Sequence, residues 1–371
     1  MKQKILIIRS QDIFTDSRVL RYEEWFKKNN IEYKILAWNR SGEEINRENT
    51  DYCNIKASFN MGKKGIVFRF KWSLFITKYL LKNKKKFDVI HACDLDTIWP
   101  ALLMKGFRKK VIFDIFDWFS DEVKTGNVFI DKCMNIMEKI ATKLSDLTII
   151  CEDHRLKQMN VFPKKHMTIP NIPDLSKYRK KQEVDKTKNK SISIAYVGGF
   201  YEDRGLIELV ETIKLFKNYE LHIAGFGDYK IERFISDAAN KTKNIYYYGR
   251  VSYNQALEIM QKADLLYAMY YKFNRNNIFA APNKFYESIF LQKPIITTAG
   301  TLVAKKVLSH NSGYVIEEGN RALKDLLLSI NKLDLISLKE NLNKYKTKYT
   351  QTFNHCMIRY LRNIKDMYRR Q

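Results

Sequence analysis

A lysine and a glutamate stand three residues apart at the start of a predicted helix, where both could contact one ligand. Lys284 and Glu287 follow a loop that contains Pro282 and Asn283, and side chains at this spacing lie on neighbouring faces of a helix. An ammonium can offset phosphate charge, and a carboxylate can accept hydrogen bonds from two sugar hydroxyls. A predicted buried strand at 294–298 comes next. The pair is either part of a ligand site or an ordinary surface ion pair.

Glycines close two predicted strand-to-helix turns in the same half of the chain. The first turn holds Gly198 and Gly199 and is followed by Arg204, and the second holds Gly225 and Gly227. Glycine lets the backbone approach a phosphate, a helix N-terminus favours an anion, and arginine adds a forked donor. Glycines also close many turns that bind nothing. Two such turns in register with the charged pair described above favour a phosphate-bearing ligand.

Four aspartates follow predicted strands in the first half of the chain. Asp94 and Asp96 come after one strand, Asp114 and Asp117 lie at the end of another, and His91 lies near the end of an apolar strand. Aspartates at such positions commonly cap the next helix, and a lone histidine there is commonly a packed residue. Capping and packing are therefore the simpler interpretations, and a metal site or a catalytic histidine is the alternative.

Strands and helices alternate through both halves of the chain, which is typical of a doubly wound α/β fold. The alternation predicts a domain at 1–174, a charged linker at 175–190, a second domain at 191–351 and a terminal helix at 352–371. Predicted strands lie at 3–8, 31–38, 87–94, 109–119, 147–152 and 166–174, then at 192–200, 219–229, 244–251, 264–271, 294–298 and 313–320.

The composition indicates a globular protein with an anionic partner. The chain has 371 residues, 45% of them hydrophobic and 29% charged, and a formal net charge of +25, which favours a phosphorylated substrate, an anionic membrane or a nucleic acid. Five cysteines without a CxxC pair argue against a disulfide framework or a zinc site. The first residues lack the apolar region of a signal peptide, so we expect a cytoplasmic protein.

Basic and aromatic residues are interleaved at 61–86, a stretch that contains no acidic residue. One interpretation places it on a membrane, with aromatic rings in the interface and lysines near lipid phosphates. A second is nucleic-acid binding through charge and stacking, and a third is a helix packed on its own sheet with a solvated basic face. The residues expected to meet the membrane are Phe68, Arg69, Lys71, Trp72 and Phe75.

The order of these segments resembles that of the retaining GT-B glycosyltransferases of family 4 across nearly the whole chain. The matching pieces are DSRVLR (16–21), DVIHACDLDTIWPALL (88–103), IFDIFDWFSDE (112–122), TIPNIPD (168–174), YVGGFYEDRGL (196–206), HIAGFGD (222–228), YGRV (248–251), APNKFYESIFLQKPIIT (281–297) and SGYVIEEG (312–319). The resemblance implies two Rossmann-like domains facing a cleft, with the last helix crossing back to the first domain.

The resemblance further implies transfer of a sugar from a nucleotide-sugar, with retained anomeric configuration and without a metal or other cofactor. The donor would be bound by Gly198, Gly199, Arg204, Gly225, Gly227, Arg250, Val251, Asn283, Lys284 and Glu287. In particular, Glu287 matches the ribose-binding acid and Arg204 a diphosphate-binding base of the family. The acceptor, a lipid-linked glycan, would contact Asp16, Arg18, His91, Asp94 and Asp117. We expect Arg204, Lys284 and Asp117 to be the catalytic residues.

Three positions depart from the family pattern. Phe279 stands where the first acid of the E-x7-E pair is expected, Gly199 where an arginine is usual, and Phe116, with Asp117 beside it, where a histidine is common. These departures keep open a non-transferring relative, such as a nucleotide-sugar epimerase or an inactive partner subunit. A basic nucleic-acid-binding protein is the remaining alternative, although it would not explain two α/β halves with donor-type loops.

Overall fold

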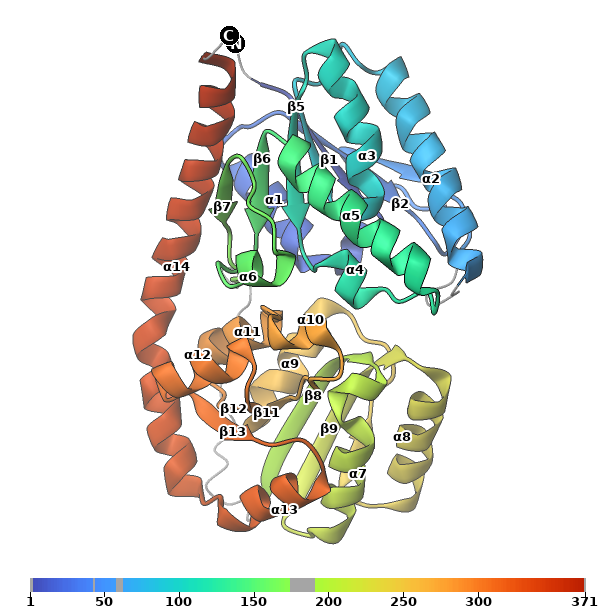
Figure 1. Ribbon diagram of the computed structural model, residues 1–371. Helices are drawn as coiled ribbons and strands as arrows, with labels where there is room; N and C mark the ends of the chain where they lie inside the picture. The colour runs from blue at the N-terminus through green and yellow to red at the C-terminus, as the bar shows by residue number, and fades with distance from the viewer. Residues whose placement is uncertain (1–2, 43, 58–62, 174–190, 370–371) are drawn as a thin grey trace. The chain divides into compact units, whose positions relative to one another are not determined.

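The chain folds into two compact units, each built on one parallel sheet (Figure 1). The computed structural model describes residues 3–42, 44–57, 63–173 and 191–369, so the predicted linker at 175–190 lies outside the described residues. One unit comprises residues 1–170 with 352–371, and the other comprises residues 171–351.

The first unit contains a seven-stranded sheet in the order β3-β2-β1-β4-β5-β6-β7. The chain leaves β1 toward one edge of the sheet and returns beside it as β4, so the order reverses between these two strands, which is where doubly wound folds bind ligands. The strands are β1 (Ile5–Arg9), β2 (Tyr33–Trp38), β3 (Thr50–Cys53), β4 (Val89–Cys93), β5 (Lys110–Ile115), β6 (Leu147–Ile150) and β7 (His166–Thr168).

Helices cover both faces of this sheet, because its strands are apolar on both sides. Leu6 and Ile8 of β1 pack under α2, α3 and α5, whereas Ile5 and Ile7 pack under α1 and the end of α14. The helices are α1 (Ser17–Lys28), α2 (Lys63–Lys82), α3 (Leu95–Leu103), α4 (Phe119–Glu122), α5 (Val128–Leu144) and α6 (Arg155–Met159).

The second unit repeats the arrangement with six strands in the order β10-β9-β8-β11-β12-β13. Its strands are β8 (Ile192–Phe200), β9 (Tyr219–Gly227), β10 (Ile245–Tyr247), β11 (Leu265–Ala268), β12 (Ile295–Thr298) and β13 (Gly313–Ile316). Its helices are α7 (Leu206–Leu215), α8 (Tyr229–Lys241), α9 (Tyr253–Lys262), α10 (Arg275–Ile278), α11 (Asn283–Leu291), α12 (Leu302–His310) and α13 (Asn320–Ser329). The prediction of two doubly wound α/β halves is confirmed.

The last helix, α14 (Lys332–Arg369), begins 20 residues before the predicted terminal helix at 352. Its final turns pack on the first unit through Met357, Tyr360 and Ile364, which are buried in the same cluster as β1 and α1. The sequence predicted only this final part of α14, because its apolar residues recur at helical spacing.

The basic-aromatic stretch forms α2, and Trp72 on it is buried in the core. Its indole ring stacks on Trp38, with 5.7 Å between ring centroids, and its Nε1–H donates to Ser10 Oγ at 2.9 Å. The predicted membrane contact of Trp72 is therefore wrong. Phe68 and Phe75 are partly buried against the same cluster, and Arg69 pairs with Asp96 at 2.6 Å. Lys71 is exposed, as is Phe70 at 64%.

Replacing Trp72 by alanine should destabilise the first unit strongly. The change removes a large buried ring and leaves the Ser10 hydroxyl without its donor, so we expect the free energy of unfolding to fall by about 3–5 kcal/mol. Phe70→Ala, two residues away on the exposed face, is the matched control and should change it by less than about 0.5 kcal/mol. Urea unfolding of both variants measures the difference, and similar losses would show that Trp72 is not in the core.

Candidate functional site

Lys284 lies beside the end of strand β8 in the second unit, and its side chain is partly buried. It is the second residue of α11, and its ammonium lies 5.1 Å from the centroid of the Tyr196 ring. A Cβ atom added at Gly198 would lie 2.7 Å from Lys284 Nζ, so glycine at this position leaves room for the ammonium. Burial lowers the pKa of Lys284 to about 8, with Glu287 opposing and Arg204 adding to the shift.

Arg204 is held next to this lysine by a buried polar framework. It ends a 3-10 helix at Glu202–Arg204, and its Nη1 lies 3.0 Å from Asp203 Oδ1 and donates to Asn277 Oδ1 at 2.9 Å. Asn277 in turn donates from Nδ2 to Asp203 Oδ2 and to the Tyr271 carbonyl, both at 2.9 Å. The Arg204 guanidinium also lies over the Tyr270 ring, 4.9 Å from its centroid. These contacts orient the guanidinium before any ligand binds.

Glu287 completes this group of charged side chains one turn further along α11. It is buried, and its Oε1 accepts a hydrogen bond of 3.1 Å from the Tyr253 hydroxyl. Tyr253 is the first residue of α9, which begins with a capping box between Ser252 and Gln255. The electrostatic contribution of Glu287 to the Lys284 pKa shows that the two side chains interact, so they are not an isolated surface pair.

The other predicted donor residues have different surroundings. Gly225 and Gly227 lie within β9, where an added Cβ would meet the Gly198 carbonyl oxygen at 1.8 Å and the Phe200 carbonyl oxygen at 2.3 Å. The approach of strand β8 accounts for both glycines, and their contact with a phosphate stays a prediction. An added Cβ at Gly199 meets the Tyr201 ring.

Three further predicted residues start or precede helices of the same unit. Arg250 lies over the Phe226 ring, 4.5 Å from its centroid. Val251 precedes Ser252, the N-cap of α9, and Asn283 is the first residue of α11.

Sequence reasoning missed Asn277, Tyr253 and the tyrosines at positions 196 and 270. Asn277 follows two other asparagines in the segment NRNN (274–277), and this polar run just before the PNK motif was the available signal. No sequence signal distinguished these tyrosines, because the chain contains 22 tyrosines.

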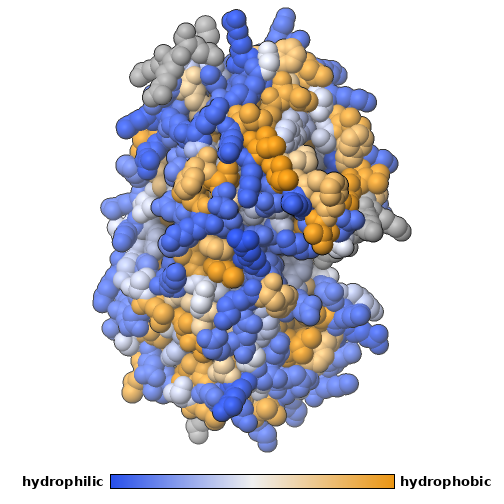
Figure 2. Space-filling view, in the orientation of Figure 1, coloured by the Kyte–Doolittle hydropathy of each residue, from blue (hydrophilic) through white to orange (hydrophobic). Residues whose placement is uncertain are grey.

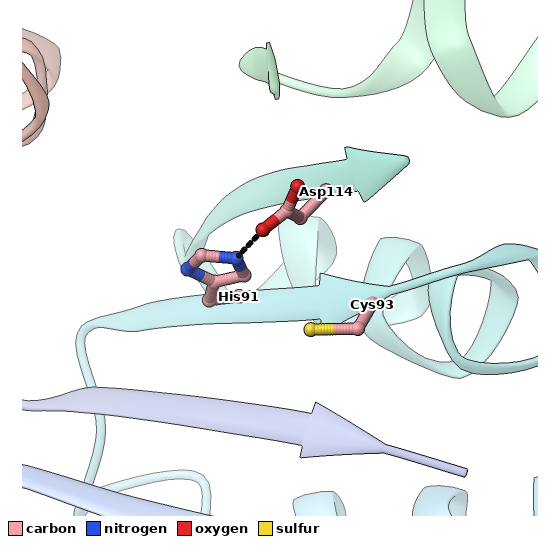
Figure 3. Close-up of side chains that lie close together, drawn as sticks. All are labelled: His91, Cys93 and Asp114. Atoms are coloured by element: carbon pink, nitrogen blue, oxygen red, sulfur yellow. Dashed lines mark hydrogen bonds and ion pairs between the residues drawn. The ribbon is translucent and has the colours of Figure 1, made fainter. Parts of the chain in front are cut away.

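In the first unit, a buried network is centred on Asp114 at the carboxyl end of β5. Its carboxylate accepts a hydrogen bond of 3.0 Å from His91 Nε2 (Figure 3). It also accepts hydrogen bonds from Arg18 Nη2 and from the Tyr22 hydroxyl, both at 2.8 Å. Burial opposes ionisation of Asp114, but Arg18 and His91 outweigh burial and hold its pKa well below the usual range. Since an ionised carboxylate only accepts, His91 Nε2 carries the proton, and Nδ1 lies 2.9 Å from the Tyr360 hydroxyl.

Three of the predicted acceptor residues form their hydrogen bonds and ion pairs within such buried networks. His91 is fully buried with both ring nitrogens engaged, and Arg18 is buried between Asp114 and the Ile169 carbonyl oxygen, to which it donates at 2.7 Å. Asp16 is buried as the N-cap of α1 and pairs with Arg9 at 2.6 Å. Direct contact of these three side chains with an acceptor is therefore a wrong prediction.

Asp94 and Asp117 remain near the surface at the carboxyl edge of the first sheet. Asp94 has φ +66°, a backbone region that costs a non-glycine residue free energy and is found mainly at functional sites. It pairs with Arg9 and accepts from the Phe116 amide at 3.0 Å, and burial raises its pKa to about 6 against the opposing effect of Arg9. Asp117 is half exposed and pairs with Arg155 at 2.6 Å.

Glu138 on α5 is a titratable group near this edge that the sequence did not reveal. Its carboxylate accepts from the backbone amides of Phe119 and Ser120 at 2.8 and 3.0 Å. Burial nevertheless raises its pKa to about 8. The only sequence signal for the burial of Glu138 was its position on the same helix face as Ala141 and Thr142.

Among the described residues, only His91, Cys93 and Asp114 are close enough together to share a metal ion (Figure 3). Their contacts have another explanation. Arg18 already supplies positive charge to Asp114, and burial raises the pKa of the Cys93 thiol well above its usual range, so the thiolate form that binds metals is disfavoured. The arrangement fits an internal ion pair better than a metal centre.

The two parallel-sheet units together have the GT-B fold. Residues 176–349 match the sequence family "Glycosyl transferases group 1". The chain therefore contains a glycosyltransferase group 1 domain, and the predicted enzyme class, a glycosyltransferase, is confirmed.

Individual relatives are distant in sequence. The chain is 21% identical over 324 residues to the capsular polysaccharide biosynthesis glycosyltransferase CapM of Staphylococcus aureus, a match that covers 80% of this chain and 79% of CapM. The sucrose-phosphate synthase structure from Thermosynechococcus elongatus has a TM-score of 0.77 at 12% identity and full coverage of both chains. The structure of WaaG, a glycosyltransferase of lipopolysaccharide biosynthesis, has a TM-score of 0.66 at 17% identity, over 93% of this chain and 95% of WaaG.

Binding of a nucleoside diphosphate should weaken as the pH rises through about 8, the pKa of Lys284. The ammonium attracts the anion and the neutral amine does not, so the affinity is full below this pKa and lost above it. Calorimetric titration with UDP and GDP between pH 7 and 9.5 measures the effect. Lys284→Arg, which stays charged throughout, is the control and should bind with little dependence on pH. Identical pH profiles for both proteins would contradict the assignment.

Proposed function

We propose that this glycosyltransferase moves a sugar from a nucleotide-sugar to a lipid-linked glycan acceptor, with retained anomeric configuration, in the assembly of a cell-surface polysaccharide. The main support is the convergence of Lys284, Arg204 and Glu287 beside the glycine turn at Gly198. The names of CapM and WaaG support the polysaccharide or lipopolysaccharide context.

The chemistry follows from the charges of this group. As the bond between the sugar C1 and the diphosphate oxygen breaks, negative charge grows on the leaving nucleoside diphosphate, and preorganised cations stabilise that charge. Lys284 and Arg204 supply two such cations, so we propose that no metal is required. Glu287 accepts hydrogen bonds from the ribose hydroxyls. The acceptor oxygen forms the new bond to C1 and passes its proton to the leaving diphosphate.

The sugar end of the donor has no acidic partner at position 279. Phe279 follows the last residue of α10 as its C-cap, and a phenyl ring cannot accept hydrogen bonds from sugar hydroxyls. Asn277, two residues earlier, is committed to Arg204 and Asp203. We therefore propose that nucleotide recognition in this chain is stronger than recognition of the sugar. Thermal-shift screening of uridine, guanosine and adenosine diphosphate sugars, each beside its free diphosphate, identifies the base and compares the two contributions.

Arg204→Ala should lower kcat for sugar transfer by about 10²–10³, the loss typical of one removed oxyanion-stabilising donor. The fold should persist, because the side chain lies at the end of a short 3-10 helix and not in the core. Arg233→Ala on α8, an exposed arginine with a weak partner at 4.0 Å, is the matched control. Transfer rates and melting temperatures of both variants are compared with those of the unaltered protein. A near-normal rate for Arg204→Ala would refute the proposed role.

We further propose that the first unit binds the cytoplasmic face of an anionic membrane through α2 and α5. Figure 2 shows apolar side chains interspersed with hydrophilic ones over this part of the unit. No helix within the described residues is sufficiently long and apolar to cross a bilayer. The exposed apolar residues are Ile66, Val67, Phe70, Leu74 and Leu81 on α2, Leu103 and Phe107 at the end of α3, and Val128, Phe129, Ile136, Met137, Ile140 and Leu144 on α5 or at its start.

Charge complementarity favours an anionic lipid surface over an apolar protein partner. The segment Lys63–Lys82 contains no aspartate or glutamate, and Lys71, Lys78 and Lys82 are exposed among its apolar residues. Lysines near an anionic leaflet contribute about 1 kcal/mol each. This surface replaces the one predicted from the sequence, in which Trp72 was a contact.

Replacing Phe70 and Leu74 together by alanine should reduce flotation with phosphatidylglycerol vesicles severalfold at moderate salt. The two side chains are exposed, so the melting temperature should be unchanged. Leu215→Ala with Leu328→Ala removes two apolar side chains of the second unit that are at least as exposed, and this variant should float like the unaltered protein. If the unaltered protein does not float with anionic vesicles at all, the membrane proposal fails while the transfer proposal stands.

A further inference from the structure

A cavity of about 470 Å³ opens at the amino-terminal edge of the first sheet. It is lined by Lys4, Tyr33, Lys34, Asp51, Tyr79, Lys85, Lys86 and Phe87. Lys4 directly precedes β1, and Tyr33 and Lys34 begin β2. Because all strands of the sheet are parallel, this edge is opposite the carboxyl edge that holds Asp94 and Asp117. The cavity is therefore separate from the proposed acceptor site.

Positive charge exceeds negative charge in this cavity. Four lysines line it against one carboxylate, Asp51, and that carboxylate is already satisfied by Lys34 Nζ at 2.8 Å and the Tyr79 hydroxyl at 2.6 Å. Lys4 pairs outside the lining with Glu32 at 2.9 Å. Lys85 and Lys86 are exposed, and neither ammonium has an ion-pair partner among the residues that the structure describes.

The lining has the chemistry of a phosphate site with one apolar wall. Lysine binds phosphate as a point charge without needing a fixed geometry, and a phosphomonoester carries about −1.5 to −2 charge near neutral pH. The rings of Tyr33, Tyr79 and Phe87 form the remaining surface. Lys4 and Lys34 are held by their carboxylate partners, so Lys85 and Lys86 are the lysines of the lining that can give their charge to a ligand.

We propose that this cavity binds a small phosphomonoester, with Lys85 and Lys86 as its main charge partners. The cavity volume lies within the range of small-molecule sites and is large enough for a phosphate attached to a glycerol-sized or sugar-sized body. The ligand can be a soluble metabolite or a lipid headgroup. Lys85 and Lys86 come three and four residues after the end of α2, whose exposed apolar residues end at Leu81, so a headgroup could be reached from the proposed membrane surface.

The test uses the full chain, glycerol 3-phosphate as the soluble probe, and vesicles that contain phosphatidic acid as the lipid probe. The variant is Lys85→Ala with Lys86→Ala, two exposed positions whose replacement leaves the core intact. The control is Lys164→Ala with Lys165→Ala, an adjacent lysine pair in the same unit that removes the same charge. Calorimetry measures the affinity for glycerol 3-phosphate. Flotation at equal mole fractions of phosphatidic acid or phosphatidylglycerol measures the lipid arm, because only phosphatidic acid carries a phosphomonoester.

The Lys85/Lys86 variant should bind the preferred probe at least tenfold more weakly, a loss of about 1.4 kcal/mol, while the Lys164/Lys165 variant binds normally. Tight binding of glycerol 3-phosphate without preference for phosphatidic acid supports the site with a soluble ligand, and a preference for phosphatidic acid supports it with a headgroup. Equal losses in both variants, or none in either, would overturn the proposal. Neither calorimetry nor flotation measures sugar transfer, so failure of the phosphomonoester proposal is distinguishable from failure of the proposed transfer activity.

Discussion

The buried carboxylate of Asp114 is the interaction on which the architecture of the first unit depends. A buried charge is tolerated only when it is paired, and removing one partner of such a pair typically costs about 3–5 kcal/mol. Asp114 on β5 meets this requirement with Arg18 and Tyr22 from α1 and His91 from β4. His91 extends the network to Tyr360 on α14. One charge therefore fixes two strands and two helices, one of which is the last helix of the chain.

The second unit contains the opposite situation, in which two partly buried cations, Lys284 and Arg204, lie close together. Burial and the nearby Arg204 both disfavour the charged form of Lys284, and Glu287 offsets only part of that effect. Such a site is preorganised for an anion, because a bound diphosphate removes the repulsion and leaves the cations in place. The framework of Asn277 and Asp203 holds Arg204 in this arrangement without neutralising Lys284. The proximity of these two cations therefore disfavours the folded unit without a ligand and favours binding of an anion.

The sequence predicted the fold because its signals are local: apolar strands of four to nine residues, glycine turns and amphipathic helices in alternation. It also predicted the pairing of Lys284 with Glu287, since both lie on one helix. It could not predict which side chains face inward where a helix is apolar on several sides, so Trp72 was placed on the surface although it is buried. Nor could it show that Gly225 and Gly227 approach a strand. Both features depend on tertiary contacts.

The basic residues of this protein fall into two physical classes that respond to different variables. Lys284 is partly buried, and desolvation lowers its pKa to about 8, so its charge depends on pH near that value. Lys71, Lys78, Lys85 and Lys86 are exposed, so salt screens their attraction to anions. A change of salt concentration therefore acts mainly on these exposed lysines of the first unit. The two proposals use these classes separately: Lys284 and Arg204 would bind the donor diphosphate, and the exposed lysines of the first unit would meet an anionic surface.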